Sequence, residues 1–339
     1  MKLQHWIHSL RYDVSFIIAP SFVAVLVLFL FPDAWLWSDA MPHWAWIVVV
    51  MLIDVSHVYS SLYRTYFDKL TRQKHTKLLF LTPVLVAIFA IGIHQISSLW
   101  FWRLAAYFAV YHFIRQQYGF LKLYTRHEGT KQLDILMIYA ATLFPILYWH
   151  LSSPRNFNWF VEGDFYLIQN QALASILKYI YWLWVLVYLV FVVKDYLKTK
   201  TFNLPKNLLI LSTMLTWYLG IVYFNGDMAF TMLNVVAHGI PYMALVYATE
   251  QKKAYKQQGI WKLIFSNFGL VFIGILALLS FIEEGLWDSL VWHDRQQIFA
   301  IFPSFQITDS LALSIIVGML SVPQLTHYVL DGYIWKRDF

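Results

Sequence analysis

The segment from Asp54 to Arg64 places an acid and an imidazole inside a stretch that is otherwise apolar. Asp54 and His57 follow Trp44–Ile53, an apolar run long enough to form most of a membrane-spanning helix. Ionisable groups at membrane depth cost roughly 3 kcal/mol each on insertion scales, so their presence indicates a function. Because the two residues are three apart, they share one face of a helix, where a metal ion can contact both.

Three later apolar runs also carry a histidine with a polar residue four positions away. These pairs, each on one helix face, are His112 with Gln116, Asn234 with His238, and His327 with Asp331. Neutral imidazole is the commonest metal ligand in proteins, and its second nitrogen is normally held by a carboxylate or a carbonyl. We therefore predict a metal site with His57, His112, His238 and His327 as ligands. Asp54 and Asp331 are further ligands or orient the imidazoles.

The chain contains no cysteine, which excludes thiolate metal sites, iron–sulfur clusters and cysteine nucleophiles. A ligand set of nitrogen and oxygen suits iron, manganese or zinc, and we favour non-haem iron. Four histidines would make a mononuclear site with open positions, and adding the two acids as ligands would allow a second metal. Iron in an aromatic, lipid-accessible cavity would suit oxygen chemistry on an apolar substrate.

Other polar residues near these histidines are candidates for supporting roles. Asp54, Asp331, Tyr59 and Arg115 are predicted to be catalytic, although Arg115 also fits a structural role or contact with an anionic headgroup. Further candidates for radical or proton roles are Tyr63 and Tyr118, and for supporting hydrogen bonds Gln116, Gln117 and Gln324. A histidine in a membrane helix also has a simpler explanation, which is a hydrogen bond to a neighbouring group or a water.

The composition is that of a membrane protein. Of the 339 residues, 60% are hydrophobic and only 13% charged, which is too few charges to cover the surface of a soluble protein of this size. We expect an all-α, polytopic membrane helix bundle that forms a single integral membrane domain over residues 1–339. Ten apolar runs have spanning length. They are Val14–Phe31, His43–Arg64, Lys77–Gln95, Leu99–Leu123, Gln132–Leu151, Leu173–Leu197, Asn207–Phe224, Met228–Glu250, Ile260–Phe281 and Leu311–Trp335.

The basic residues alternate between the loops in a regular way. Among the loops on one side of the ten runs, the Lys and Arg residues are Arg155 and Arg295, whereas the loops on the other side and both termini hold most of the 25. By the positive-inside rule, both termini lie in the cytoplasm, and the four histidines fall at or on the cytoplasmic side of the midplane. This dispersed pattern also argues against nucleic acid as a partner. We expect a bacterial inner membrane protein whose partners are the bilayer and a lipid or isoprenoid substrate.

A compact helical bundle with histidines on separate membrane helices resembles the membrane β-carotene dioxygenases of bacteria and archaea (the Brp/Blh group). The residues that carry the resemblance are His57, His112, His238 and His327. The resemblance implies one non-haem iron, held by these histidines, that splits a polyene with oxygen. The HxxxH and HxxHH patterns of membrane desaturases and hydroxylases do not occur in this sequence.

The leading hypothesis is thus a membrane-embedded, metal-dependent oxidoreductase of oxygenase type acting on a lipid or isoprenoid. A second hypothesis is a metal-free multipass acyl- or glycosyltransferase with His238 as base beside Asn234. A third is a proton-coupled transporter with a relay of Asp54, His57, His327 and Asp331. A haem protein with paired histidines is a fourth.

Overall fold

Helices form the regular structure of the chain. The structure, a computed structural model, describes residues 4–254, 260–266 and 269–335. Across these residues the β structure is limited to an isolated bridge between Asn156 and Gly226. The predicted all-α class is therefore confirmed. The basic residues Lys2, Lys256, Lys336 and Arg337, which belong to the predicted charge pattern, lie outside the described ranges.

The chain divides into two compact units, each assembled from segments far apart in the sequence. Unit 1 comprises residues 1–45, 110–159 and 165–241, and unit 2 comprises residues 46–109, 160–164 and 242–339. Two long helices, α8 (Ser98–Tyr124) and α12 (Asp227–Ala254), contribute one part to each unit.

The remaining elements belong to one unit each. Unit 1 contains α1 (Leu10–Asp13), η1 (Val14–Ile18), α2 (Ala19–Leu28), α3 (Asp33–Leu36), α4 (His43–Ala45), α9 (Gln132–Leu151), α10 (Gln171–Thr199), α11 (Leu204–Trp217) and η4 (Tyr218–Tyr223). Unit 2 contains η2 (Trp46–Val55), α5 (Ser56–Ser60), η3 (Ser61–Tyr63), α6 (Lys69–Lys74), α7 (Thr76–Ile96), α13 (Ile260–Ile264), α14 (Leu270–Trp287), η6 (Asp288–Trp292), α15 (Ser310–Leu320) and α16 (Val322–Ile334). Of the η segments named here, η3 is a 3₁₀ turn and the others are π-helical.

Seven helices in the described residues are long and apolar enough to cross a membrane. They are Leu10–Leu28, His43–Tyr63, Thr76–Ile96, Gln132–Leu151, Gln171–Thr199, Asp227–Ala254 and Leu270–Trp292. The pair α15 and α16 adds an eighth if the two helices, bent by 41° at their junction, form one span. Two further predicted runs, Leu99–Leu123 and Asn207–Phe224, are helical as α8 and as α11 with η4, but they are not among the seven.

The predicted run Ile260–Phe281 has the wrong bounds. The helix α14 begins at Leu270, after Gly269 in the left-handed region with a φ of 76°, and continues through η6 to Trp292. The helix therefore includes Glu283, Glu284 and Asp288, acids that the sequence pattern had placed at the end of a span or in the following loop.

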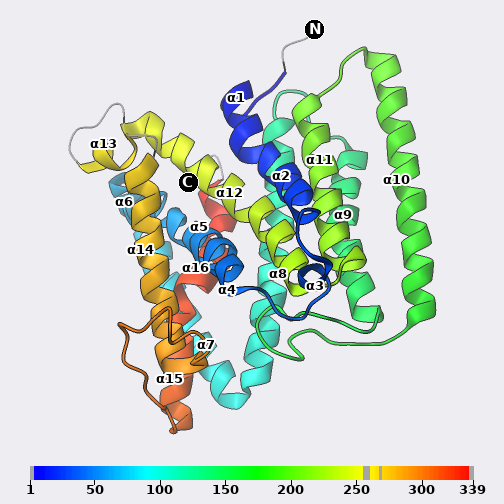
Figure 1. Ribbon diagram of the computed structural model, residues 1–339. Coiled ribbons are helices and arrows are strands. Elements are labelled where there is room, and N and C mark those ends of the chain that lie inside the picture. The colour runs from blue at the N-terminus through cyan, green and yellow to red at the C-terminus, as the bar shows by residue number, and fades with distance from the viewer. Residues whose placement is uncertain (1–3, 255–259, 267–268, 336–339) are drawn as a thin grey trace. The chain divides into compact units, whose positions relative to one another are not determined.

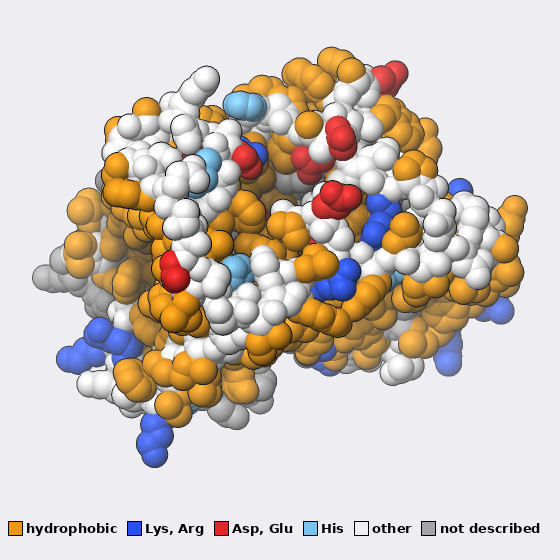
Figure 2. Space-filling model, turned by 90° about the horizontal axis from the view of Figure 1, so that it is seen from below, with side chains coloured by type: hydrophobic (Ala, Val, Ile, Leu, Met, Phe, Trp, Pro, Cys, Tyr) orange, Lys and Arg blue, Asp and Glu red, His pale blue; other side chains and the backbone are white. Residues whose placement is uncertain are grey.

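Apolar side chains cover the outer faces of the long helices, as expected for contact with hydrocarbon. On α10 the exposed side chains include Ile176, Leu183 and Leu186, and on α7 they include Leu85 and Ile88. Figure 2 shows hydrophobic side chains over much of the face seen from below. Exposed apolar area on this scale marks a surface that does not face water.

In unit 1, α9 packs between α10 and α11, and these helices lie side by side in Figure 1. A buried ion pair joins two of them: Nζ of Lys206 in α11 donates to Oδ1 of Asp134 in α9 at 2.9 Å. The same oxygen accepts a hydrogen bond from the hydroxyl of Tyr188 in α10 at 2.7 Å. Asp134 thus connects all three helices.

In unit 2, α15 packs closely on α7, and α14 packs on η2 and α5. A charged network connects the ends of several segments around the buried Glu250 of α12. Arg64 donates to Glu250 at 3.2 Å and to the carbonyl oxygen of Ile334 at 2.8 Å. Lys253 lies 2.9 Å from Glu250 and 2.5 Å from Asp68. The network fixes the end of η3 against α12 and α16.

Candidate metal site

Asp54 and His57 come from adjoining helical turns of unlike geometry. Asp54 lies near the end of η2, a π-helix of ten residues, and His57 lies in α5 directly after it. Long π-helices are rare, and π-helical turns occur frequently at functional sites. The imidazole of His57 is 1% exposed, whereas the side chain of Asp54 is 25% exposed, and Nδ1 of His57 lies 3.4 Å from Oδ1 of Asp54. The acid therefore sits beside the imidazole at the accessible end of the pair.

The second histidine of unit 2 lies against the first. His327 of α16 is 1% exposed, and its ring centroid lies 5.0 Å from that of His57, with the rings nearly perpendicular. One nitrogen of each ring lies within 4.8 Å of the other. Two nitrogens that share one ion lie about 3–4 Å apart, given metal–nitrogen distances near 2.0–2.1 Å. A small side-chain movement would therefore let both imidazoles bind one ion.

Tyr242 of α12 encloses this pair and connects it to Asp331. Its ring makes edge contacts with His57 at 5.7 Å and with His327 at 5.1 Å. The carboxylate of Asp331 lies near Tyr242 and accepts a hydrogen bond from Nε1 of Trp335 at 2.8 Å. Asp331 thus lies beside Tyr242, which in turn packs on both histidines.

Unit 1 contains the other two predicted ligands, also as a pair. The ring centroids of His112 in α8 and His238 in α12 are 4.9 Å apart. Both residues are buried, and the ring of Phe113 stacks on His238 at 3.7 Å. The structure therefore brings the four predicted histidines together as two buried pairs, one in each unit.

Hydrogen bonds from α8 hold the backbone of α12 beside His238. Nε2 of Gln116 donates to the carbonyl oxygen of His238 at 2.8 Å, and Nε2 of Gln117 donates to that of Ala237 at 3.5 Å. Pro241 lacks the N–H that would bond to Ala237 four residues earlier. α12 nonetheless continues through Pro241 without a break. The predicted supporting role of Gln116 and Gln117 is confirmed, and their target is the part of α12 that Pro241 leaves under-bonded.

Pro323 lies in the first turn of α16, directly after the 41° bend between α15 and α16. A proline is tolerated in a first turn, where its missing N–H would have no partner in the helix. The change of direction between the two helices therefore falls about one turn before His327.

The other sequence candidates lie in different surroundings. Arg115 is exposed, donates to the hydroxyl of Tyr139 at 2.8 Å, and lies over the ring of Tyr118. Tyr63 is buried in an aromatic cluster with Phe265 and Phe272. These contacts stabilise helix packing. Gln324 of α16 donates to the hydroxyl of Tyr328 at 2.7 Å, which is the supporting type of contact predicted for it.

Sequence reasoning missed Glu283 as a neighbour of the Asp54–His57 pair. Glu283 is buried and lies within interaction range of Tyr59, Trp287 and Asp54. The sequence does indicate that the helix continues, because no helix-terminating residue separates the apolar run 270–282 from the two acids that follow it. Glu283 is thus a third carboxylate in unit 2 near the histidine pair, beside Asp54 and Asp331.

Comparison with models of known families, with curated proteins and with solved structures finds no match. The class of protein therefore follows from the chain itself: an all-helical protein of membrane type with two buried histidine pairs. In unit 2 one of these pairs has a carboxylate beside it.

Proposed function

We propose that this protein is a membrane-embedded metal-dependent oxidoreductase, with iron as the favoured metal, that acts on a lipid or isoprenoid. The observation that carries the proposal is the pair His57 and His327, enclosed together and accompanied by Asp54. Burying polar rings inside a membrane protein is costly, and metal ligation repays that cost. A carboxylate beside one ligand nitrogen is a recurring partner of metal-bound histidine.

The ligand set of the proposal is all four histidines. His57 and His327 supply two imidazoles from unit 2, and His112 and His238 supply two from unit 1. Nitrogen and oxygen donors without sulfur suit iron, manganese or zinc. The metal content per chain decides whether the histidines hold one ion or two.

In the proposal, other residues of the protein orient the ligands and keep water away from them. Asp54 would orient the imidazole of His57 and offer an accessible carboxylate to the substrate side. Tyr242 would keep the rings of His57 and His327 in place and exclude water from them. When bound, the metal supplies a centre at which dioxygen is reduced while an apolar substrate is oxidised.

Apolar helix faces such as those of α7 and α10 support a substrate that arrives through the bilayer. In the proposal both termini are cytoplasmic, the histidines lie in the cytoplasmic half, and the membrane is the bacterial inner membrane. The distribution of Lys and Arg among the loops supports this orientation.

Metal analysis of the purified protein tests the proposal. We expect a stoichiometric transition metal in the wild type, and a loss in each of the variants His57→Ala, His327→Ala, His112→Ala and His238→Ala. His150→Ala is the matched control, because His150 lies outside both pairs and its Nδ1 lies 2.7 Å from the carbonyl oxygen of Ile146 in its own helix. Oxygen uptake by protein in vesicles of total lipid extract should follow the metal content. Trace metal that is equal in all the variants would overturn the proposal.

A proton-coupled transporter is the second candidate, and one observation favours it. Asp54, Glu283, Tyr59 and His57 lie in one neighbourhood, and acids together with imidazoles inside membrane helices form proton relays in pumps and transporters. Proton movement into protein-containing vesicles, abolished by Glu283→Gln in a metal-free protein, would favour this candidate over the oxidoreductase.

A further inference from the structure

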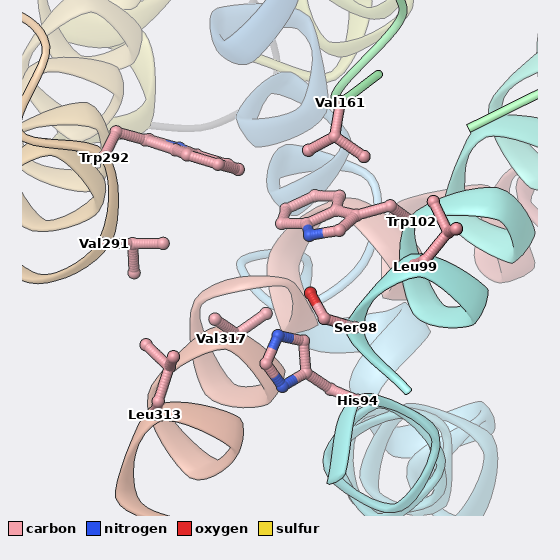
Figure 3. Close-up of a pocket in the computed structure, with 9 residues that line it drawn as sticks. All are labelled: His94, Ser98, Leu99, Trp102, Val161, Val291, Trp292, Leu313 and Val317. Carbon is pink, nitrogen blue, oxygen red and sulfur yellow. The ribbon is translucent and has the colours of Figure 1, made fainter. Parts of the chain in front are cut away.

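Unit 2 contains a cavity of about 370 Å³ at the junction of α7, α8, η6 and α15. This volume falls in the range of about 300–1,000 Å³ typical of small-molecule sites. Figure 3 shows the side chains around it. They are His94, Ser98, Leu99, Trp102, Val161, Val291, Trp292, Leu313 and Val317.

The walls of the cavity are apolar and well supported. The ring centroids of Trp102 and Trp292 lie 5.1 Å apart, and Trp287 packs on both. Figure 3 shows Val161 at one end of the cavity and His94 at the other. Indole rings supply large apolar area with little conformational freedom to lose.

The loop that contributes Val161 is fixed to unit 2 by hydrogen bonds. The buried carboxylate of Asp164 accepts from the backbone N–H groups of Phe160 at 2.7 Å and Val161 at 3.4 Å. Nε of Arg103 donates to the carbonyl oxygen of Gly163 at 2.8 Å. The cavity wall is therefore a positioned part of the fold.

A hydrogen-bond chain determines which atom His94 presents to the cavity. Nδ1 of His94 lies 2.8 Å from Oγ of Ser314, and that hydroxyl donates its own proton to the carbonyl oxygen of Ser310 at 2.9 Å. Ser314 must therefore accept, so Nδ1 of His94 carries the proton. His94 is 8% exposed, and its cavity-lining neighbours include no acid, so a neutral ring is favoured. Its Nε2 is then a hydrogen-bond acceptor.

Figure 3 shows this second nitrogen directed toward the side of the ring where Ser98 and Trp102 lie. Ser98 follows His94 by four residues, and its hydroxyl both donates and accepts. The polar end of the cavity thus offers an acceptor from His94 and a donor from Ser98. All other lining residues have apolar bodies.

We propose that this cavity binds an apolar molecule carrying a single hydroxyl group, of the long-chain alcohol class. The hydroxyl donates to Nε2 of His94 and accepts from Oγ of Ser98, while the chain lies between Trp102 and Trp292. A plain hydrocarbon offers no hydrogen-bond donor to Nε2 of His94 and no acceptor to the hydroxyl of Ser98, which disfavours it relative to an alcohol. This proposal does not depend on the metal site. A negative result for the cavity would leave the proposed oxidoreductase standing, and a negative result for the metal would leave the cavity proposal standing.

Competition against a photoreactive long-chain alcohol tests the proposal, with the full-length protein in lipid nanodiscs and the labelled peptides identified by mass spectrometry. The competitors are 1-dodecanol, dodecane and dodecyl methyl ether, which accepts a hydrogen bond but donates none. We expect labelling of α8 or α15 that dodecanol displaces about tenfold better than dodecane, the value of one good hydrogen bond. The ether should displace the label only about as well as dodecane does, because it cannot donate to Nε2 of His94.

His94→Phe keeps a ring of similar size and removes the acceptor, so the preference for dodecanol should disappear while dodecane competes as before. Val317→Trp fills the cavity and should abolish labelling, with thermal unfolding reporting whether the variant is folded. His150→Phe is the control and should behave as the wild type. Equal competition by dodecanol and dodecane in the wild type, or a preference that survives His94→Phe, would overturn the proposal.

Discussion

Nδ1 of His57 lies 3.4 Å from Oδ1 of Asp54, with the imidazole enclosed and the carboxylate partly accessible. The two residues belong to different helix types, since Asp54 lies near the end of the π-helix η2 and His57 lies in the α-helical turn that follows. The acid is thus placed beside one ring nitrogen of the imidazole and leaves the other nitrogen for a ligand.

Asp54→Asn should weaken metal binding about 10–100-fold, the usual effect of losing a group that orients a ligating histidine. The reason is that the amide retains the size of the carboxylate but not its charge. Competition with a chelator of known affinity measures the change. Asp68→Asn, a charge change elsewhere in unit 2, is the control. Unchanged affinity in Asp54→Asn would show that the acid does not orient His57.

Asp134→Asn should destabilise the protein by about 3–5 kcal/mol, because it leaves the buried ammonium of Lys206 without its counter-charge. The matched control is Asp195→Asn, which breaks the more exposed pair with Lys131 and should cost about 0–1 kcal/mol. Denaturant unfolding in one detergent compares the two. The double variant Asp134→Leu with Lys206→Met should recover most of the loss. Similar costs for both single variants would contradict the expectation.

Gly318→Ala and Gly274→Ala should change stability in opposite directions. A Cβ on Gly318 would lie 2.4 Å from Cγ1 and 2.9 Å from the backbone nitrogen of Ile91, so α15 would have to move away from α7. Nothing lies within 4 Å of a Cβ on Gly274, where alanine should stabilise α14 by up to about 1 kcal/mol. The shift of the thermal midpoint measures both. A stabilised Gly318→Ala would show that α15 and α7 do not pack this closely.

The stability contributed by Asp68 should depend on pH. Burial raises the pKa of this carboxyl, but hydrogen bonds from Lys253 and from the N–H groups of Thr71 and Leu70 more than offset that, so its pKa lies below its ordinary value. A carboxyl with a lowered folded-state pKa stabilises the protein above its unfolded pKa, near 3.9, and the stabilisation is lost as pH falls through the folded pKa.

Asp68→Asn keeps the helix cap of α6 and removes the charge. Its thermal midpoint should lie below that of the wild type at pH 7, and the difference should shrink as the pH falls below about 4. Asp39→Asn, at an exposed position, should show no difference at either pH. A difference in thermal midpoint between the wild type and Asp68→Asn that stays constant from pH 7 to below about pH 4 would exclude the ion pair with Lys253 as its cause.

Local sequence patterns predicted the all-α class and the position of most helices, because hydrophobic runs are a property of neighbouring residues. The spacing of Asp54 and His57 also predicted their contact, since helix geometry alone brings residues three apart together. The predicted bounds of this span were wrong because Glu283 and Glu284 resemble a helix end in sequence, whereas both lie within α14 and Glu283 sits beside Tyr59 and Trp287.

The division of the histidines into pairs could not be predicted. His57 meets His327, and His112 meets His238, through packing between helices that are far apart in the sequence. No periodic pattern in the sequence indicates which histidines meet. The π-helical geometry of η2 could not be predicted either, because its composition is that of any apolar helix.

The two pairs differ in when they can form during synthesis. The chain emerges from its N-terminal side, so both His112 and His238 are present before α16 is made. His57, although it is the first of the four to emerge, meets His327 only after α16 has followed. The first histidine of unit 2 in the chain therefore meets its partner only after one of the last helices has been made. A chain interrupted anywhere between α12 and α16 would contain the first pair complete and the second half-made.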